Sequence, residues 1–192
     1  MKKIILASSS PRRRRILADM GLEFEVISPD YDENISRRAF SYELVENTAL
    51  NKALSILHKT DRNSAVISAD TVVVYNSIII GKPKDYDDAV RMLKMLSGKT
   101  HKVITGVCLI DTETGRKIIK SDTSEVSFNE LPPEMIKDYV LNFKPYDKAG
   151  SYGIQELADG WVKETSGEFD NIIGMPSKLL KEMMIEAGLM QN

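Results

Sequence analysis

The first 21 residues constrain the fold more than any other stretch, because they combine a buried strand, a loop of small residues and a helix start. Residues 4–6, Ile-Ile-Leu, form an apolar run that suits a strand covered on both faces. Residues 8–10 are serines, Pro11 suits a first helical position, and Gly21 suits a helix end. This order predicts an α/β protein in which the loop and the helix N-terminus bind an anion.

Four consecutive arginines, Arg12–Arg15, stand in the first turn of that helix. Positive charge there opposes the helix macrodipole, so the arrangement costs stability unless an anion binds. The apolar periodicity places Arg13 near the centre of the inward face with Arg12 beside it, whereas Arg15 points outward. We therefore expect Ser8, Arg12 and Arg13 to meet a polyphosphate. A basic helix start without a ligand is the alternative.

Two carboxylate positions follow predicted strands. Residues 24–27 end at an acidic loop in which Asp32 and Glu33 repel each other, and a divalent cation would relieve that repulsion. A solvated acidic loop is the alternative. The buried run 65–69 delivers Asp70 and Thr71 to an expected strand end, where ligands of open α/β sheets bind. An ionised Asp70 could hold a metal or accept a proton from water; the alternative is an Asp that caps a turn.

Two lysines have ligand-binding potential. Lys52 falls within the apolar stripe of a helix expected over 41–58, where its ammonium group either reaches the surface or meets an anion. Lys82 lies between Gly81 and Pro83, a context that limits backbone motion and suits a phosphate contact, although such a tripeptide is also an ordinary turn.

Further elements are expected from periodicity and turn residues. Helices are predicted over 85–96, 132–141 and 177–187, hairpins over 72–80 and 102–128, and a turn over 171–176. His101 is expected at the edge of a strand. No repeat or linker divides the chain, so residues 1–192 are predicted to form a single domain.

The composition limits the classes of partner and compartment. The 192 residues carry a net charge of −2, which provides no general attraction for nucleic acid. Cys108 is the single cysteine and lies in an apolar run, which favours a reducing compartment. No stretch resembles a signal peptide or reaches membrane-spanning length. We therefore expect a cytoplasmic protein that binds neither membranes nor nucleic acid.

These motifs together resemble the Maf family of nucleotide pyrophosphatases, whose members have also been associated with inhibition of septum formation. The opening LASSSPRRRRIL, residues 6–17, matches that family's first motif. Similar motifs continue in the family's order at Asp32-Glu33, Lys52-Ala53, 68–71 (SADT), 81–83 (GKP), 147–155 (DKAGSYGIQ) and 173–176 (IGMP). The resemblance covers nearly the whole chain.

The resemblance implies an elongated mixed sheet with flanking helices and two lobes around a cleft, similar to the inosine-triphosphate pyrophosphatase fold. It also implies a cleft walled by Ser8, Arg12, Arg13, Glu33, Lys52, Asp70, Thr71, Lys82 and Gln155. The implied reaction is hydrolysis of a nucleoside triphosphate between its α- and β-phosphates, assisted by Mg²⁺ or Mn²⁺ at Glu33 and Asp70. Asp70 would be the general base, a metal ligand, or both. A homodimer is a further implication.

Three positions distinguish subgroups of the family. Arg12, Thr71 and Gln155 resemble the subgroup that acts on dTTP and UTP, whereas relatives acting on 7-methyl-GTP and similar nucleotides carry Trp, Gln and Glu. A guanidinium, a hydroxyl and an amide match the carbonyl acceptors and imide N–H of uracil or thymine. The alternatives are a pyrophosphatase for modified nucleotides, a non-catalytic nucleotide sensor, and a septum-linked interaction protein.

Overall fold

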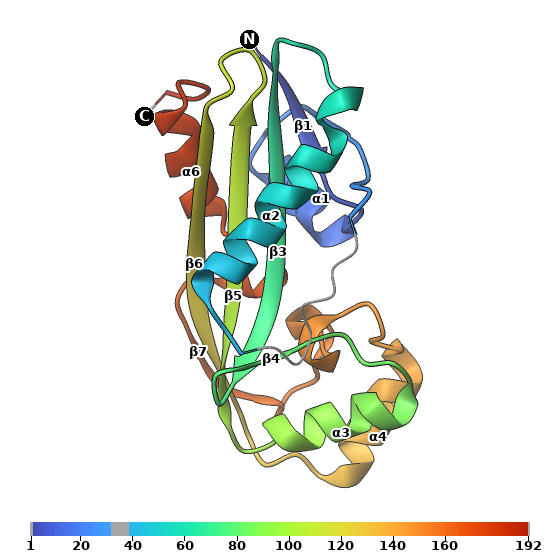
Figure 1. Ribbon diagram of the computed structural model, residues 1–192. Helices are drawn as coiled ribbons and strands as arrows, with labels where there is room; N and C mark the ends of the chain where they lie inside the picture. Colours follow the sequence, from blue (N-terminus) through green and yellow to red (C-terminus); the bar gives the residue numbers. More distant parts are fainter. Residues whose placement is uncertain (1, 32–38, 192) are drawn as a thin grey trace.

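The computed structural model describes residues 2–31 and 39–191, and within them one seven-stranded sheet runs along the molecule (Figure 1). In sheet order its strands are β2 (Phe24–Val26), β1 (Lys3–Ala7), β3 (Ser64–Tyr75), β5 (Thr100–Asp111), β6 (Lys117–Phe128) and β7 (Val162–Ser166), with β4 (Ile78–Ile80) paired to β3. β1 pairs in parallel with β2 and β3, and the other pairings are antiparallel. The prediction of a mixed sheet is confirmed.

Six α-helices and three short 3₁₀ turns are present in the described residues. They are α1 (Pro11–Asp19), α2 (Tyr42–Ile56), α3 (Tyr86–Leu96), α4 (Pro133–Phe143), α5 (Phe169–Ile173), α6 (Ser177–Glu186), η1 (Leu57–Lys59), η2 (Ala149–Ser151) and η3 (Ile154–Glu156). Ser41 caps α2 by accepting from the Leu44 N–H, and Asp85 caps α3 by accepting from the Asp88 N–H. The predicted helices are confirmed as α1, α2, α3, α4 and α6.

Three strands of 12 residues each, β3, β5 and β6, form the long axis of the molecule. Both predicted hairpins are confirmed. β3 turns into β4 through Asn76 and Ser77, whose φ angles of 49° and 61° fit a tight turn that follows the strand twist. β5 pairs with β6 in unbroken antiparallel register from Thr100 to Ile110.

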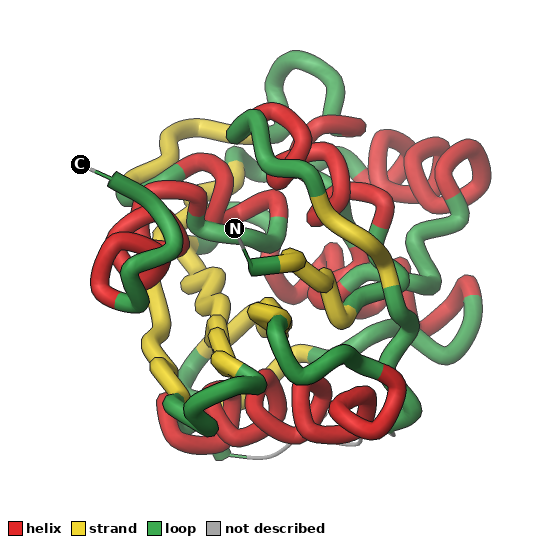
Figure 2. The backbone as a smooth tube through the Cα atoms, turned by 90° about the horizontal axis from the view of Figure 1, so that it is seen from above, coloured by secondary structure: helices red, strands yellow, loops and turns green. Residues whose placement is uncertain are grey.

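Helices cover both faces of one end of this sheet, as the view from above shows (Figure 2). On one face α2 packs Ala49 and Ile56 against Val66 of β3 and Cys108 of β5. Burial raises the pKa of the Cys108 thiol to about 12, so this cysteine is an unreactive core residue. We call this end, with β1, α1, α2 and α6, the upper lobe.

Close approach of α2 to the sheet depends on Gly106 of β5. A Cβ atom at that position would lie 2.9 Å from the carbonyl oxygen of Val45, so a larger residue would push the helix away. On the opposite face, Leu17 of α1 and Met183 of α6 pack against Ile67 of β3. Fully burying each such side chain contributes about 1.5–3 kcal/mol.

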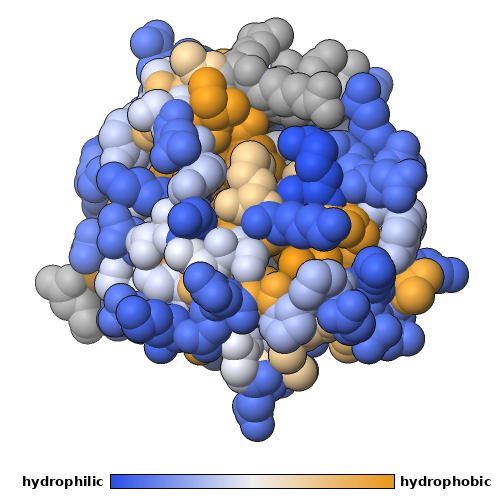
Figure 3. Space-filling view, turned by 90° about the horizontal axis from the view of Figure 1, so that it is seen from below, coloured by the Kyte–Doolittle hydropathy of each residue, from blue (hydrophilic) through white to orange (hydrophobic). Residues whose placement is uncertain are grey.

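The other end of the sheet carries a separate core, which we call the lower lobe. It contains α3, α4 and residues 144–161 (Figure 1), with Leu93, Val140 and Phe128 packed around the fully buried Trp161. Seen from below, apolar surface extends from the upper part of the face to its middle and is overlaid and bordered by hydrophilic side chains (Figure 3). The expectation of two lobes on an elongated sheet is confirmed.

Two local expectations are wrong. The predicted turn over 171–176 begins inside α5, which ends at Ile173 and is followed by Gly174 with φ of 130°. His101 does not lie at a strand edge: it is buried in β5 opposite Val126 of β6, and its ring contacts Phe128 and Tyr152. The polar residues on either side of His101 suggested an exposed position, but side chains of the lower lobe cover it.

Candidate active site

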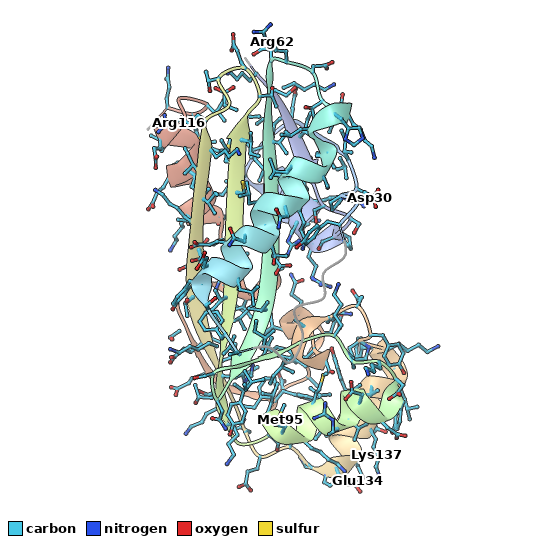
Figure 4. The ribbon with its side chains drawn as sticks, viewed as in Figure 1. Asp30, Arg62, Met95, Arg116, Glu134 and Lys137 are labelled. Carbon is cyan, nitrogen blue, oxygen red and sulfur yellow. The ribbon has the colours of Figure 1, made fainter. Side chains whose placement is uncertain are left out.

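A cleft of about 330 Å³ separates the upper and lower lobes. The side-chain view places Asp30 at the side of the upper lobe, and Met95, Glu134 and Lys137 on the lower lobe (Figure 4). Arg62 and Arg116 mark the opposite end of the sheet. Among the predicted site residues, those that line the cleft are Ser8, Arg12, Arg13, Lys52, Asp70, Thr71, Lys82 and Gln155. Glu33 lies outside the described residues.

One wall is the loop between β1 and α1. Ser8 is buried directly after the strand, and its hydroxyl accepts a hydrogen bond from the Ser10 N–H at 3.2 Å. Pro11 occupies the first turn of α1, and no acidic side chain stands there. The predicted strand, serine loop and helix start are confirmed, and the positive end of α1 lines the cleft.

Arg13 is held by a network of hydrogen bonds. Its Nε donates to the carbonyl oxygen of Gly174 at 2.8 Å, and its two terminal nitrogens donate to Thr71 at 3.0 Å and Ser8 at 3.4 Å. These contacts tie α1 to β3 and to the end of α5. Arg13 therefore brings a fixed positive charge to the cleft and also joins three segments of its wall.

The Thr71 hydroxyl belongs to the same network. It lies 2.9 Å from the hydroxyl of Thr105 and 3.3 Å from the carbonyl oxygen of Gly174, in addition to its bond from Arg13. The Thr105 hydroxyl lies within hydrogen-bonding distance of the carbonyl oxygen of Asn171. Since these partners occupy the hydroxyl, Thr71 acts in this conformation by fixing its neighbours.

Lys52 and Asp70 form a buried ion pair. Lys52 Nζ lies 2.6 Å from Asp70 Oδ1 and 3.4 Å from the carbonyl oxygen of Ala69, and the two side chains are 3% and 5% exposed. The other oxygen, Asp70 Oδ2, is buried and has no hydrogen-bond partner among the described residues. Of the two outcomes expected for Lys52, the ammonium group meets an anion, and that anion is a carboxylate of the protein.

The expectation that Asp70 ends a strand is wrong. β3 continues without interruption to Tyr75, and the strand that ends here is its neighbour β1, whose Ala7 pairs with Ser68. Beyond that pair one edge of β3 is left without its parallel partner. Successive residues of a strand point to opposite faces of the sheet. Because no neighbouring strand covers this edge, Asp70 on one face and Thr71 on the other both line the cleft.

The opposite wall comes from the lower lobe. Lys82 follows β4 and is exposed to the cleft, and Gln155 lies exposed on η3. The Arg12 guanidinium reaches across to Asp147, with 3.5 Å between Nη1 and Oδ2. Burial raises the pKa of Asp147, but hydrogen bonding to Lys148 and the charge of Arg12 outweigh it and lower the pKa overall.

Sequence reasoning assigned no role to Asp147, Lys148 or Glu156, which also line the cleft. Lys148 Nζ lies 3.0 Å from Asp147 and 3.2 Å from Glu156 while only 8% of the residue is exposed. The available signal was the family motif over 147–155, which did not show which of its charged side chains the fold buries.

Comparison with known proteins agrees with this architecture. Residues 3–187 match the family model described as Maf-like protein. The chain belongs to the Maf family. The dTTP/UTP pyrophosphatase of Alkaliphilus oremlandii is 46% identical over 176 residues, covering 92% of this chain and 91% of the relative. The dTTP/UTP pyrophosphatase of Acetivibrio thermocellus is 42% identical over 195 residues, covering 98% and 97%.

A solved structure shares the fold of this Maf chain. A HAM1 protein from Coxiella burnetii superposes with a TM-score of 0.52 at 15% sequence identity, over 97% of this chain and all of the other. At this identity the similarity is one of fold. Within the described residues, this Maf chain has no helix long and apolar enough to cross a membrane.

The donor set of this Maf site fits a divalent cation that is shared with a phosphate ligand. The unpartnered oxygen of Asp70 is a hard ligand atom, while the described residues contain no cluster of three His, Cys, Asp or Glu side chains that could enclose a metal. Mg²⁺ at phosphate sites typically takes one or two carboxylates and completes its shell with phosphate and water. Asp70 meets that requirement.

Proposed function

We propose that this protein is a nucleoside triphosphate pyrophosphatase that acts best on dTTP and UTP. The observation that carries the proposal is the buried Asp70, which is paired through one oxygen with Lys52 and presents the other without a partner. It stands in a cleft with basic side chains on both walls. The relatives named dTTP/UTP pyrophosphatase support the assignment over more than nine-tenths of the chain.

In the proposed reaction, Asp70 is the general base. Lys52 holds Oδ1, so Oδ2 is the atom that accepts a proton from water. The water oxygen forms a bond to the α-phosphorus, and the bond from that phosphorus to the α,β-bridging oxygen breaks. The bridging oxygen leaves with pyrophosphate, and the nucleoside monophosphate is the other product.

Positive groups stabilise the charge that develops on the phosphate oxygens. Lys82 and Arg12 reach the cleft from opposite lobes, and the N-terminal turn of α1 with Ser8 presents N–H and hydroxyl donors. Arg13 adds a charge whose position is fixed by Gly174 and Thr71. Such preorganised groups stabilise a transition state without having to reorient during the reaction.

Glu33 would hold Mg²⁺ or Mn²⁺, and Asp70 Oδ2 would join it where Asp70 acts as a metal ligand as well as, or instead of, the base. When bound, the cation would polarise the phosphate and neutralise part of its charge.

We assign base recognition to Arg12, Thr71 and Gln155. The exposed amide of Gln155 offers one acceptor and two donor hydrogens, which suits the alternating carbonyl and imide groups of uracil and thymine. Thr71 contributes by fixing Arg13 and Gly174 beside this pocket. Cytosine carries an amino donor in place of one carbonyl acceptor and a ring-nitrogen acceptor in place of the imide N–H. A protein group that suits uracil would therefore face a group of its own kind when cytosine binds, and this unpaired contact would cost affinity.

The proposed setting is the cytoplasm, consistent with a buried cysteine that needs no oxidising compartment. We propose a homodimer as the assembled form.

The direct test is to incubate the purified protein with UTP, dTTP, CTP, ATP, GTP and 7-methyl-GTP in the presence of Mg²⁺ or Mn²⁺. Chromatography should show monophosphate and pyrophosphate in equal amounts, formed fastest from UTP and dTTP. Tight binding of UTP without turnover would favour a nucleotide sensor. Faster hydrolysis of 7-methyl-GTP or ATP than of UTP at equal concentration would contradict the assigned base preference.

A further inference from the structure

The segment that carries Gln155 is held in place by three side chains, those of Tyr139, Lys148 and Glu156. Glu156 follows Gln155 in η3, and its Oε1 lies 3.2 Å from Lys148 Nζ. Its other oxygen, Oε2, accepts a hydrogen bond from the Tyr139 hydroxyl at 2.8 Å. The Gln155 side chain itself makes no hydrogen bond within the described part of the chain. The position of its amide is therefore set by the η3 backbone and by whatever holds Glu156.

The same tyrosine also holds the start of the segment. The Gly153 N–H donates to the Tyr139 hydroxyl at 3.0 Å, and the Glu156 N–H donates to the carbonyl oxygen of Gly153 at 2.9 Å. A single phenol thus joins both ends of residues 153–156. Tyr139 is only 4% exposed on α4, and its ring packs against Trp161 with 5.0 Å between ring centroids.

Gly153 supplies the space that this arrangement needs. A Cβ atom there would lie 3.1 Å from Glu156 Oε2 and 3.1 Å from Lys148 Cε, which is tighter than ordinary contacts. The absence of a side chain at Gly153 therefore lets the carboxylate and the lysine stem lie directly against the backbone of the segment.

The charges make the anchor stable at neutral pH. Lys148 is nearly buried and lies between the carboxylates of Asp147 and Glu156, so its positive charge is compensated by the protein. Burial raises the pKa of the Tyr139 hydroxyl, as does the nearby Glu156, so the phenol stays protonated and can donate. Such a satisfied network in a poorly solvated place restricts the segment more than isolated surface contacts would.

We propose that Tyr139, Glu156 and Lys148 are positioning residues that set the base specificity of the cleft by fixing Gln155. This inference rests on the proposed function, because it takes the cleft as a nucleotide site in which Gln155 faces the base. It adds that discrimination between pyrimidines depends on Tyr139, which lies behind the cleft wall, and on the two charged side chains of that wall that hold the Gln155 segment. The hydrolytic step, which uses Asp70 on the other lobe, depends on them much less.

The sharpest variant is Tyr139→Phe, because Tyr139 is not one of the residues that line the cleft and loses a single oxygen atom. Tyr42→Phe is the matched control: its hydroxyl lies 3.4 Å from that of Thr123, outside the cleft. Values of kcat and KM would be measured for UTP and CTP with both variants and with the unaltered protein. Amide hydrogen exchange of Gly153 would be followed in parallel.

We expect Tyr139→Phe to reduce the ratio of kcat/KM for UTP to that for CTP by roughly tenfold, since the partly buried Gly153 N–H and Glu156 carboxylate lose their shared partner. The kcat for UTP should stay within about threefold, and exchange at Gly153 should become faster. Tyr42→Phe should change none of these. Glu156→Gln, which keeps an acceptor for Tyr139 but loses the charge that faces Lys148, should produce a smaller change in the same direction.

An unchanged UTP to CTP ratio in active Tyr139→Phe and Glu156→Gln proteins would overturn this inference and leave the proposed function intact. Equal losses on both nucleotides, through kcat, would overturn it as well. An unaltered protein that hydrolyses neither nucleotide would instead overturn the proposed function. In that case unchanged exchange at Gly153 in Tyr139→Phe would show that the anchor itself is absent.

Discussion

Lys52 Nζ on α2 lies 2.6 Å from Asp70 Oδ1 on β3, and both side chains are almost completely buried. Removing two opposite charges from water costs on the order of several kcal/mol per ion. Their mutual attraction offsets this cost only while both charges remain in place. The pair therefore fixes the orientation of Asp70 and links activity to stability at this position. This relationship distinguishes the expected effect of replacing Lys52 from that of replacing Lys82, the other lysine predicted in the cleft wall.

Asp70→Asn should abolish most activity in a protein that still folds, with lower stability because Lys52 loses its buried ionic partner. The amide preserves the shape of the side chain but accepts no proton from water, and loss of a general base typically costs about 10²–10⁴-fold in rate. Steady-state kinetics with UTP would measure this, with Asp159→Asn, a change at an exposed residue outside the cleft, as the control. Activity within about tenfold of the unaltered protein, about 1.4 kcal/mol in barrier, would rule out Asp70 as the base.

Lys52→Met and Lys82→Met should differ in stability. Removing the ammonium of Lys52 leaves Asp70 buried beside an apolar side chain, and we expect a loss of about 3–5 kcal/mol in unfolding free energy. Lys82 is exposed at the cleft, so its replacement should lower kcat/KM with a stability change of about 0.5 kcal/mol or less. Urea unfolding followed by circular dichroism would measure both.

The double variant Lys52→Met with Asp70→Asn supplies the control for the ion pair, because the buried negative charge disappears with its partner. Part of the lost stability should return. Equal, small shifts in the unfolding midpoint for the two lysine variants would contradict the buried-pair interpretation of Lys52.

Local sequence patterns predicted the strand, serine loop and helix start at 4–19 because each depends on neighbouring residues. They could not show that β1 ends beside Ser68, since strand pairing joins distant segments; Asp70 was consequently placed at the end of its own strand instead of its neighbour's. The charge compensation of Lys148 escaped prediction for a similar reason, because Glu156 becomes its partner only through the turn at 149–156.

The role expected for Arg13 shows a second limit. Helical periodicity correctly aimed this residue inward, but the carbonyl oxygen it meets belongs to Gly174, far along the chain. No local pattern indicates that the carbonyl oxygen of a residue so distant in sequence will bind this guanidinium. The family resemblance was what brought Gln155 and Lys82 into the same predicted cleft as Asp70.

Gln155→Glu should change specificity more than turnover. A carboxylate offers only acceptors, so it loses the donor expected to face a carbonyl of uracil or thymine. We expect kcat/KM for UTP and dTTP to fall by at least tenfold, mainly through KM, while the circular dichroism spectrum and melting temperature stay the same. An equal loss of kcat on every triphosphate would contradict a role in base recognition.

Stability should decline at acidic pH partly because of His101. Burial lowers its pKa from 6.5 to about 4, so the folded protein keeps the ring neutral while the unfolded chain begins to bind a proton below pH 6.5. The contribution of neutral His101 to the unfolding free energy is complete above pH 6.5. It is lost as the pH falls toward 4, at up to about 1.4 kcal/mol per pH unit.

Urea unfolding at pH 7 and pH 5 would test this dependence. The decline in unfolding free energy between the two values should be about 2 kcal/mol smaller for His101→Phe than for the unaltered protein, because the phenyl ring does not titrate. His58→Gln, a change at the exposed histidine, should leave the decline unchanged. Parallel pH profiles for His101→Phe and the unaltered protein would contradict a buried neutral imidazole.

The most direct test of the central claim is hydrolysis of UTP in water enriched in ¹⁸O, followed by mass spectrometry of both products. Attack of water on the α-phosphorus beside Asp70 requires that the isotope enter UMP and that pyrophosphate remain unlabelled. Labelled pyrophosphate, or formation of UDP and inorganic phosphate, would contradict the account.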